Sequence, residues 1–485
     1  MDTILNELKA NPCLRLIINA SKGYSQEIYL VGGYLRDLFL KRKKAIFDFD
    51  FAVSSSAIKI SRQISRSLKS PFVVLDKEHG SSRIVYKKGD FSCNFDFTDY
   101  RGKDIEEDIL HRDFSLNSMA INLRSLERAG RLEDLLLAPY GARKDIKNRI
   151  IRKVSDFSLP EDPLRILRAF SLSAVLNFKI EARTKLAIKK YKGKITSCAF
   201  ERISEELFKI LDSENAFKTF KAMDEFKILD ELMPEIKVMR KVAQGPYHHL
   251  DVYGHCLEAL KQVEALFLEL KRSRDIQNYL EEKISGSHSR RALLKLGAFL
   301  HDIGKPVSKE RIKGKTCFHG HERAGRNIAR IISERLRLAN DERGVLDKMI
   351  FWHLRPGYLA DIENLSQRAL YKYFRDTAAE AVSVLLLSIA DQRSTRGPLT
   401  RGANRKHHED VCLGLAKEFF RRSKKKELPK LINGDDLIRN FRLSPGPLIG
   451  KILEEVKEAQ GAGEIETKAQ ALELAKEFAK VKPFK

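Results

Sequence analysis

The chain has 485 residues, and its 90 Lys and Arg against 66 Asp and Glu give a formal net charge of +24. With 43% hydrophobic and 32% charged residues, the composition excludes a disordered chain, and the length predicts about three domains. The N-terminus lacks the apolar stretch of a signal peptide, and the longest apolar run, residues 381–390, is too short for a membrane span. The positive excess favours a polyanionic partner such as nucleic acid, although a basic surface can also serve solubility alone.

Six cysteines are scattered along the chain without a CxxC pair. This spacing argues against a disulfide scaffold and against a cysteine-based zinc ribbon. It is typical of a protein in a reducing compartment, so we expect a cytoplasmic protein without a membrane partner.

Between residues 28 and 100 the sequence predicts five strands, and beyond about residue 150 the apolar spacing is mostly helical. The expected fold class is therefore an α/β head, with a small mixed sheet and helices, followed by an all-helical body. The expected strands are residues 28–31, 47–53, 72–76, 82–87 and 93–98.

The segment FDFDF at residues 47–51 alternates strictly between phenylalanine and aspartate. In a strand, successive side chains point to opposite faces, so the phenylalanines enter a core while Asp48 and Asp50 stand together on the other face. Two close carboxylates repel each other unless a cation lies between them, and Mg²⁺ suits such a pair. The alternative is a solvated surface strand.

Upstream, the predicted strand at residues 28–31 runs into Gly32 and Gly33 and then into a helix that carries Arg36. Two glycines between a strand and a helix let backbone N–H groups approach a phosphate at the helix N-terminus. An ordinary tight turn is the alternative. Together with the aspartate pair, the turn predicts a triphosphate cradle beside a metal site.

A third carboxylate is expected near this pair. In the segment CNFDFT at residues 93–98, the alternation leaves Asp96 on the polar face. Asp99 is the competitor, but its position in the alternation puts it on the side of Phe95 and Phe97. The sequence therefore favours Asp96 as the third catalytic carboxylate.

These motifs, LVGGYLRDLFL and FDFDFAVS, resemble the opening motif of class II tRNA nucleotidyltransferases, the family of CCA-adding enzymes and bacterial poly(A) polymerases. The segment HRDFSLNSMA at residues 111–120 resembles the second family motif. The resemblance implies that Arg112 and Asn117 handle the ribose and triphosphate and that Asp113 positions them. A helix N-cap is the alternative role of Asp113. The implied cofactor is Mg²⁺ and the implied partners are tRNA, CTP and ATP.

The segment EDPLRILR at residues 161–168 is expected to open a helix with Pro163 in its first turn. Asp162 and Arg165, three residues apart, share a face, where they could read the edge of a base or merely pair with each other. The segment resembles the family's EDxxRxxR motif, which implies that Asp162, Arg165 and Arg168 select the nucleotide. ERISEEL at residues 201–207 resembles the following motif, which braces this neck.

Two departures from the family pattern stand out. Residues 138–142, APYGA, replace the usual Asp-Pro-x-Gly-Gly turn, and Asp134 is an uncertain substitute. The link from Asp96 to His111 also looks short. In the family, a shortened loop here accompanies enzymes that add only the two cytidines.

Eight of the 12 histidines lie between residues 248 and 353, and several stand beside acids. Imidazole and carboxylate together suit Zn²⁺, Mn²⁺, Fe or Ni²⁺. HDIGK at residues 301–305 and the spread of His and Asp around it resemble the HD phosphohydrolase domain. The resemblance implies one metal held by His255, His301, Asp302 and Asp391, with His321 and His353 available for a second. A degenerate HD domain kept as a scaffold is the alternative.

The remaining chain resembles the small helical domain with which HD-bearing family members grip tRNA. Its basic run at residues 421–426 is either part of that grip or a solvated charge run. The expected domains are a nucleotidyltransferase head (1–145), a neck for nucleobase recognition and RNA binding (146–240), an HD phosphohydrolase-like domain (241–396) and a helical tRNA-binding tail (397–485).

The sequence thus predicts a Mg²⁺-dependent tRNA nucleotidyltransferase that adds CMP, with AMP addition left open, and that carries a possible second phosphohydrolase site. A poly(A) polymerase and an HD phosphohydrolase with an RNA-binding head are the alternatives.

Overall fold

The computed structural model describes residues 2–42, 47–89, 91–424 and 429–481. The chain divides into two compact units. The first comprises Met1–Ile210 and Ala222–Leu232, and the second comprises Leu211–Lys221 and Met233–Lys485. Within the described part of the chain, no helix combines the length and the apolar character that crossing a membrane requires.

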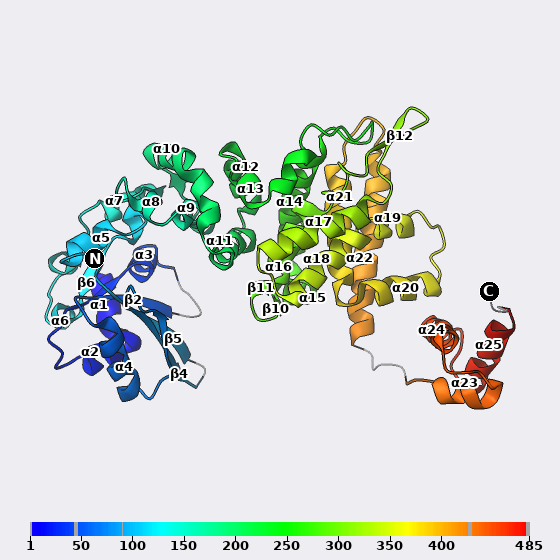
Figure 1. The fold of residues 1–485 in the computed structure, drawn as a ribbon, viewed down its shortest axis with the longest axis horizontal. Coiled ribbons are helices and arrows are strands. Elements are labelled where there is room, and N and C mark those ends of the chain that lie inside the picture. The colour runs from blue at the N-terminus through cyan, green and yellow to red at the C-terminus, as the bar shows by residue number, and fades with distance from the viewer. Residues whose placement is uncertain (1, 43–46, 90, 425–428, 482–485) are drawn as a thin grey trace. The chain divides into compact units, whose positions relative to one another are not determined.

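The first unit begins with a head built on a seven-stranded sheet in the order β3-β4-β5-β2-β1-β6-β7 (Figure 1). The pairing of β2 with β5 is parallel, and the other pairings in this sheet are antiparallel. The predicted small mixed sheet is therefore confirmed. The strands are β1 Ile28–Val31, β2 Phe47–Val53, β3 Phe72–Asp76, β4 Ser81–Lys88, β5 Phe91–Asp99, β6 Ala120–Asn122 and β7 Leu136–Leu137.

Helices surround this sheet, and α4 packs against β4 and β5 while α3 packs against β2. The helices of the head are α1 Asp2–Ala10, α2 Pro12–Ala20, α3 Gly33–Phe39, α4 Ala57–Ser67, α5 Ile105–Leu110, α6 Leu123–Leu126 and α7 Ala142–Asn148, with 3₁₀ turns at Ser115–Asn117 and Leu132–Asp134.

One face of β2 and β5 is buried by aromatic rings. Phe49, Phe51, Phe95 and Phe97 are at most 1% exposed, and the centroids of Phe51 and Phe97 lie 4.9 Å apart. Such pairs add about 0.5–1.5 kcal/mol beyond simple burial. Phe47, which we also expected in this core, has a side chain outside the described residues. The opposite face of both strands is left to polar residues.

The neck follows as a set of helices, and it departs from the expectation at residues 161–168. The helix there is split, because Asp162 is extended, with φ −137° and ψ 96°, and Pro163 is the N-cap of α9 rather than a first-turn residue. A residue that precedes proline avoids the helical region, which explains the break. The helices are α8 Ser158–Glu161, α9 Leu164–Leu176, α10 Ala182–Tyr191, α11 Phe200–Asp212, α12 Ala216–Glu225 and α13 Ile228–Leu232, and β8 Ile150–Ile151 pairs with β9 Lys179–Ile180.

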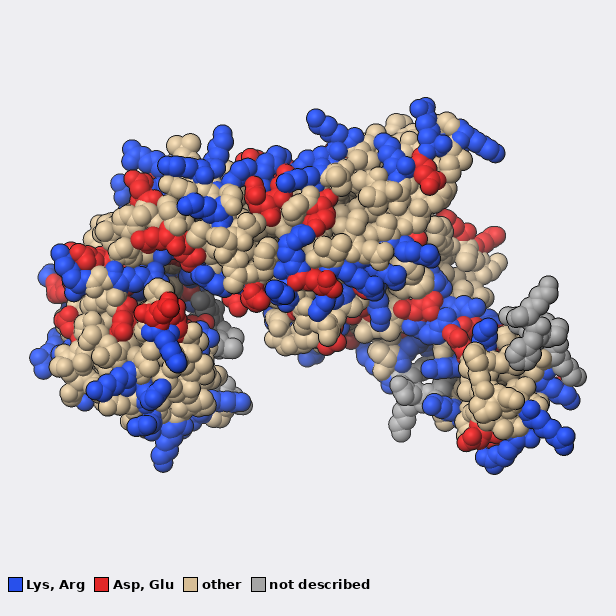
Figure 2. Space-filling model, viewed as in Figure 1, with Lys and Arg blue, Asp and Glu red and all other residues tan. Residues whose placement is uncertain are grey.

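Lys and Arg side chains gather over the surface of α10 in Figure 2. Its sequence ARTKLAIKKY supplies four of them within one helix. A concentration of cations on one helix is the electrostatic form expected of a surface that meets a polyanion.

The second unit is helical, and α14, α16, α18 and α21 pack against one another to form its body. Helix α22 packs against α19 and α21, so this helix lies with the HD helices although we assigned its sequence to the tail. The helices are α14 Val252–Glu269, α15 Arg274–Glu281, α16 Arg290–Leu300, α17 His321–Arg335, α18 Asn340–Trp352, α19 Arg355–Ala360, α20 Gln367–Thr377, α21 Ala381–Ser394 and α22 Gly402–Ser423. Two hairpins, β10 Lys283–Ile284 with β11 His288–Ser289 and β12 Glu310–Ile312 with β13 Lys315–Cys317, join them.

Three further helices, α23 Gly434–Phe441, α24 Pro447–Gly461 and α25 Lys468–Val481, share a small core of their own. Lys425 and Lys426, part of the predicted basic run, lie outside the described residues. Arg421 and Arg422 of the same run both pair with Glu418 on α22, so these two charges are partly neutralised within their own helix.

Candidate active site and metal cluster

The predicted carboxylates come together on the polar face of β2 and β5. The parallel register places Asp50 opposite Asp96 and Asp48 opposite Asn94. The side chain of Asn94 donates to Asp48 at 2.8 Å. The structure therefore brings Asp48, Asp50 and Asp96 into one row, while Asp99 lies apart from them and accepts from the backbone N–H of Ala57.

Asp96 is already paired with an arginine side chain. Arg83, which stands opposite Asp96 on β4, donates to both of its carboxylate oxygens at 2.7 Å. A bidentate arginine–carboxylate pair of this kind fixes the orientation of the carboxyl group. Asp48 and Asp50, the other two carboxylates of the row, have no bidentate arginine partner of this kind in the described part of the chain.

Burial raises the pKa of Asp50, and the negative charges of Asp96 and Asp48 add to the rise, although Arg112 opposes it. An ionised Asp50 is therefore costly in the protein alone. A divalent cation beside it would reverse that cost, and protons would compete with the cation as the pH falls. The carboxylate row thus fits the oxygen ligands that Mg²⁺ prefers.

Gly32 brings the backbone directly against this row. It caps the N-terminus of α3 with φ 79° and ψ −144°, a region that side-chain-bearing residues rarely adopt. A Cβ atom built on Gly32 would lie 2.8 Å from Oδ2 of Asp50 and 3.5 Å from Nη1 of Arg112. The glycine turn is therefore required by close approach, which is the property expected of a phosphate cradle.

Behind the cradle, a chain of polar contacts joins the head to the neck. Arg36 donates to Oδ1 of Asn117 at 2.7 Å, and the amide of Asn117 donates to Asp113 at 3.1 Å. Asp113 in turn pairs with Arg168 of α9 at 2.8 Å. Burial opposes ionisation of Asp113, but Arg168 and Asn117 outweigh it and lower the pKa of this carboxyl.

Asp113 is not the helix N-cap that we considered as an alternative. Phe114 holds the N-cap position of a single 3₁₀ turn at Ser115–Asn117, and Asp113 accepts from the N–H of Phe114 at 2.7 Å. Arg112, its neighbour, instead pairs with the buried Asp108 through Nε and Nη2.

Asp162 and Arg165 do not pair through their side chains. Oδ2 of Asp162 pairs with Arg202 at 2.8 Å, whereas Arg165, 5% exposed, donates to the backbone carbonyls of His111, Arg112 and Ser158. The alternative of a simple intrahelical ion pair is thus wrong. The assignment of both residues to base selection stays a prediction.

In the second unit, six predicted ligands form one cluster around Asp302. Nε2 of His255 lies 2.9 Å from Asp391 and 3.5 Å from Oδ2 of Asp302, and Nε2 of His301 lies 3.3 Å from the same oxygen. On the other side, Nε2 of His321 and of His353 lie 3.3 Å and 3.7 Å from Oδ1 of Asp302. The two carboxylate oxygens therefore face two different groups of ligands.

The tautomers of three histidines follow from their backbone contacts. Nδ1 of His301, His321 and His353 each lies 2.7–2.9 Å from the carbonyl oxygen three residues earlier. A carbonyl only accepts, so each Nδ1 carries a proton, and Nε2 is the ring nitrogen that faces Asp302 and is left for a metal. This is how a protein prepares imidazole ligands for a metal.

Burial and neighbouring charges set the protonation of the cluster. Burial opposes protonation of His301, but the charge of Asp302 outweighs it and raises the pKa of this imidazole well above its ordinary value, so a metal would have to displace a proton there. Burial opposes ionisation of Asp302, but Lys305, with Nζ 2.6 Å away, and His301 hold the pKa of the carboxyl well below its ordinary value. Burial lowers the pKa of His353 to about 3 and that of the neighbouring His248 to about 4. Burial raises the pKa of Cys256, which also lies against His301 and Asp302, so its thiol keeps the proton.

These residues fit a divalent metal. His255, His301 and Asp391 have ligand atoms within 4.8 Å of one another, and so do Asp302, His321 and His353. Neutral imidazoles with carboxylates are a donor set for Zn²⁺, Mn²⁺, Fe or Ni²⁺. We expected Asp302 only in the group with His255, His301 and Asp391. Its second oxygen also faces His321 and His353, so Asp302 lies between the two groups.

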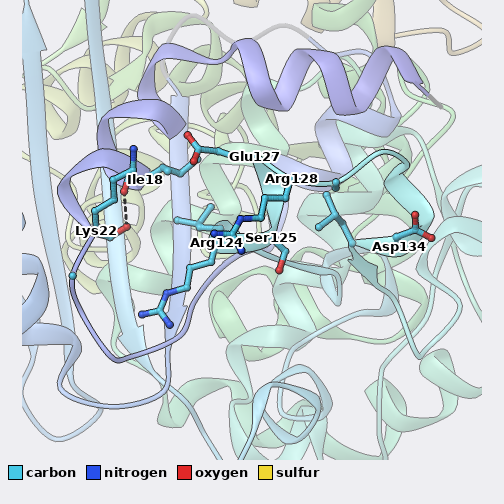
Figure 3. A pocket seen from close by; sticks show the side chains of 12 residues that line it. Ile18, Lys22, Arg124, Ser125, Glu127, Arg128 and Asp134 are labelled. Atoms are coloured by element: carbon cyan, nitrogen blue, oxygen red, sulfur yellow. Dashed lines mark hydrogen bonds between the residues drawn. The ribbon is translucent and has the colours of Figure 1, made fainter.

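A further cavity of about 570 Å³ in the head is lined by none of these residues (Figure 3). Arg124, which lines it, is held by the backbone carbonyls of Tyr24 and Gln26. The guanidinium is therefore engaged in holding the preceding loop rather than offered to a ligand.

Four family models match the chain in succession. The model for the poly A polymerase head domain matches residues 28–152, and the HD domain model matches residues 252–396. The model described as "Probable RNA and SrmB- binding site of polymerase A" matches residues 177–239, and that for tRNA nucleotidyltransferase domain 2 matches residues 361–475. Together these models reach from residue 28 to residue 475, so the chain is similar over most of its length to the family of tRNA nucleotidyltransferases and poly(A) polymerases.

Relatives in this family are similar along almost their whole length. An A-adding tRNA nucleotidyltransferase of Deinococcus radiodurans is 28% identical over 94% of this chain and 96% of its own. A CC-adding tRNA nucleotidyltransferase of Geobacter sulfurreducens is 28% identical over 97% of this chain and 96% of its own. Among solved structures, a Thermotoga maritima CCA-adding enzyme complexed with tRNA has the same fold, with 22% identity, a TM-score of 0.61 and coverage of 99% and 98% of the two chains.

Several residues of the two sites were missed by the sequence patterns. Arg83, Asp108 and Arg202 each hold a predicted family residue by an ion pair, and Asp145 accepts from Ser115 beside the second family motif. Arg202 lies within the bracing motif at residues 201–207, but that motif does not indicate that its partner is Asp162, and the motifs carry no signal for Arg83, Asp108 or Asp145. The alternation of β4 could have placed Arg83 on the polar face, but only the strand register shows that it meets Asp96.

We predict that Gly32→Ala weakens divalent-cation binding at least tenfold, because the new methyl group would displace the Asp50 carboxylate and strain a positive φ by about 1–2 kcal/mol. Titration calorimetry with Mn²⁺ on a protein that carries His301→Ala and Asp302→Ala isolates the head site. Gly130→Ala is the matched control, since its added Cβ meets nothing within 4 Å. Unchanged affinity in Gly32→Ala would contradict the close-approach role.

Proposed function

We propose that the chain is a tRNA nucleotidyltransferase that adds CMP to the tRNA 3′ end, without a nucleic-acid template, to build or repair CCA. The observation that carries this proposal is the row of Asp48, Asp50 and Asp96 beside the close glycine turn at Gly32. The A-adding and CC-adding relatives support the choice of tRNA over a poly(A) substrate.

In the proposed reaction, the 3′-hydroxyl of tRNA gives up its proton to solvent as its oxygen forms a bond to the α-phosphorus of the nucleotide. The bond from that phosphorus to the bridging oxygen breaks, and pyrophosphate leaves with the electron pair. Mg²⁺ at Asp48 and Asp50 supplies charge neutralisation for the transfer when bound. The rest is positioning by the protein, which can contribute several kcal/mol.

The residues around the row have separate tasks in this proposal. Backbone N–H groups at Gly32 and Gly33 and the guanidinium of Arg112 meet the triphosphate. Asn117 meets the ribose and is held by Asp113 and Arg36. Because the pair of Asp113 with Arg168 reaches α9, the same contacts fix the nucleotide relative to the neck.

Base selection is assigned to Asp162 and Arg165, with Arg168 beside them. To donate to a base, Arg165 has to exchange backbone carbonyl partners for the base edge, while Asp162 is oriented by Arg202. Because the position of Arg165 depends on these carbonyls, we propose that the geometry of the neck determines which nucleotide is accepted.

The segment that joins the head to this pocket favours a CC-adding enzyme. Strand β5 ends at Asp99 and α5 begins at Ile105, and the turn between them is tied down. The N–H of Lys103 donates to Glu107 at 2.9 Å, and a Cβ on Gly102 would lie 2.5 Å from that residue. A short, anchored turn cannot act as a lever that reshapes the pocket from cytosine to adenine.

We predict that the enzyme extends a tRNA lacking CCA by two cytidines and then stalls. The fixed pocket should exclude ATP, since base hydrogen bonds fail beyond roughly 3.2 Å. Labelled CTP and ATP, with products separated at single-nucleotide resolution, measure this. Efficient ATP incorporation onto a tRNA ending in CC would restore a full CCA-adding assignment.

A second expected outcome concerns Asp50→Asn, which should lower nucleotide addition by about a thousandfold or more, because the cation loses several kcal/mol of charge stabilisation. Gel-shift affinity for tRNA should stay within a few-fold. Asp76→Asn, an intermediate-exposure carboxylate at the end of β3, serves as control. Near-parental addition by Asp50→Asn at saturating Mg²⁺ removes the residue from the cation site.

The cluster around Asp302 supports a second candidate function, a metal-dependent phosphohydrolase. A divalent metal there, such as Mn²⁺ or Ni²⁺, supplies Lewis-acid chemistry when bound. In the proposed reaction the oxygen of water forms a bond to phosphorus, the bond from phosphorus to the alcohol oxygen breaks, and the alcohol leaves with a proton. The convergence of three Nε2 atoms on one buried carboxylate is the observation that favours it over an inert scaffold.

We expect the double variant His301→Ala with Asp302→Ala to lose Mn²⁺ binding in the second unit and any phosphodiesterase activity toward bis-p-nitrophenyl phosphate, while nucleotide addition persists. Elemental analysis of metal-loaded protein gives the binding readout. His319→Ala, an exposed histidine near the cluster, is the matched control. Equal metal content in the double variant and the parent favours the scaffold alternative.

A further inference from the structure

A cavity of about 1020 Å³ opens beside the metal-ligand cluster in the second unit. Asp302, His353 and Asp391 form part of its wall, so a molecule in the cavity reaches the ligand groups directly. A cavity of this size accommodates a small organic ligand. The remaining wall therefore decides which ligand is held against the cluster.

Part of that wall comes from the start of α22, which lies outside the matched HD segment. Arg401 is the N-cap residue of α22, and Arg405 follows four residues later, so both arginines lie on one face of the helix. Asn404 lines the cavity between them. Two guanidinium groups one turn apart make a forked set of donors that matches the oxygens of a phosphate group.

These two arginines are not neutralised by neighbouring acids. Among the described residues, neither forms an ion pair. The one hydrogen bond that their guanidinium groups make there is from Arg405 to the carbonyl of Thr395, at 3.4 Å. Other cations nearby are paired: Arg393 binds Glu269 and Glu409. The cavity wall also holds four carboxylates, and none of them forms an ion pair with either arginine: Asp302, Asp361, Glu363 and Asp391.

The helix itself adds to this positive field. Helix α22 runs for 22 residues, carries no acidic residue in its first turn, and has no side-chain cap at Arg401. Its first N–H groups are thus left for a ligand, and the macrodipole places partial positive charge at the same end. The buried Lys305, 8% exposed, lies in the same cavity wall, but its charge is paired with Asp302, so the uncompensated positive charge of the wall comes from α22.

We propose that Arg401 and Arg405 bind the phosphate group of a phosphate-ester substrate and hold it against the cluster around Asp302. This inference rests on the proposed phosphohydrolase function. It makes α22 part of the hydrolytic site, with its arginines as binding residues and the cluster as the reactive part.

The test uses the full-length protein loaded with Mn²⁺ and titrated with inorganic phosphate by calorimetry. Arg401→Ala and Arg405→Ala should each weaken phosphate binding about tenfold, and the double variant more. Mn²⁺ content should be unchanged, which shows that the cluster is intact. Arg396→Ala is the matched control, since Arg396 is an exposed arginine of the same connection and does not line the cavity.

Hydrolysis of bis-p-nitrophenyl phosphate separates this inference from the function on which it rests. If the parent is active, loss of the arginines should raise KM about tenfold with little change in kcat. The variant Arg405→Lys should have a KM between those of the parent and of Arg405→Ala. A parent that binds phosphate through the two arginines but hydrolyses nothing supports the binding site and removes the hydrolase. The proposed binding site is overturned if the double alanine variant binds phosphate as tightly as the parent does. It is also overturned if the parent binds no phosphate.

Discussion

The parallel pairing of β2 with β5 places Asp50 beside Asp96 and thereby fixes where the chemistry of the head can occur. Side chains alternate in a strand, so the register that aligns the carboxylates on one face also stacks four phenylalanines on the other: Phe49, Phe51, Phe95 and Phe97. The aromatic core and the acidic row are two consequences of one pairing. A one-residue slip would bury the aspartates and expose the rings, so the register is strongly specified.

The neck is tied to this sheet by polar contacts rather than by apolar packing alone. Arg36, Asn117, Asp113 and Arg168 form a continuous series from α3 to α9. Arg36, Asn117 and Asp113 are buried while Arg168 is exposed, and removing a partner of one of the buried members leaves that member without compensation. The proposed nucleotide pocket and α9, which we propose takes part in base selection, are therefore coupled through Asn117, the side chain proposed to meet the ribose.

How much the sequence could predict differs between the two sites. The alternation in FDFDF and CNFDFT was enough to predict which aspartates share a face, because the period of a strand is local. The HD ligands came from family resemblance alone, since His255 and Asp391 meet across 136 residues of helical chain, and no local pattern encodes that contact. The partners Arg83 and Arg202 could not be predicted because each depends on long-range packing. The helix expected at residues 161–168 was split because a proline effect on Asp162 outweighed the apolar spacing.

The fork between Arg83 and Asp96 has a consequence for how ions and substrate arrive. Arg112 is matched by Asp108 and Arg168 by Asp113, so the ion pairs of the site leave Asp48 and Asp50 as its two uncompensated charges. Two such charges are balanced by a single divalent ion. A second ion would leave the empty site with excess positive charge, whereas an incoming triphosphate carries enough negative charge to restore electroneutrality. With both carboxylates ionised, the charge count predicts an order of assembly, in which one ion binds the protein and a second ion enters with the nucleotide.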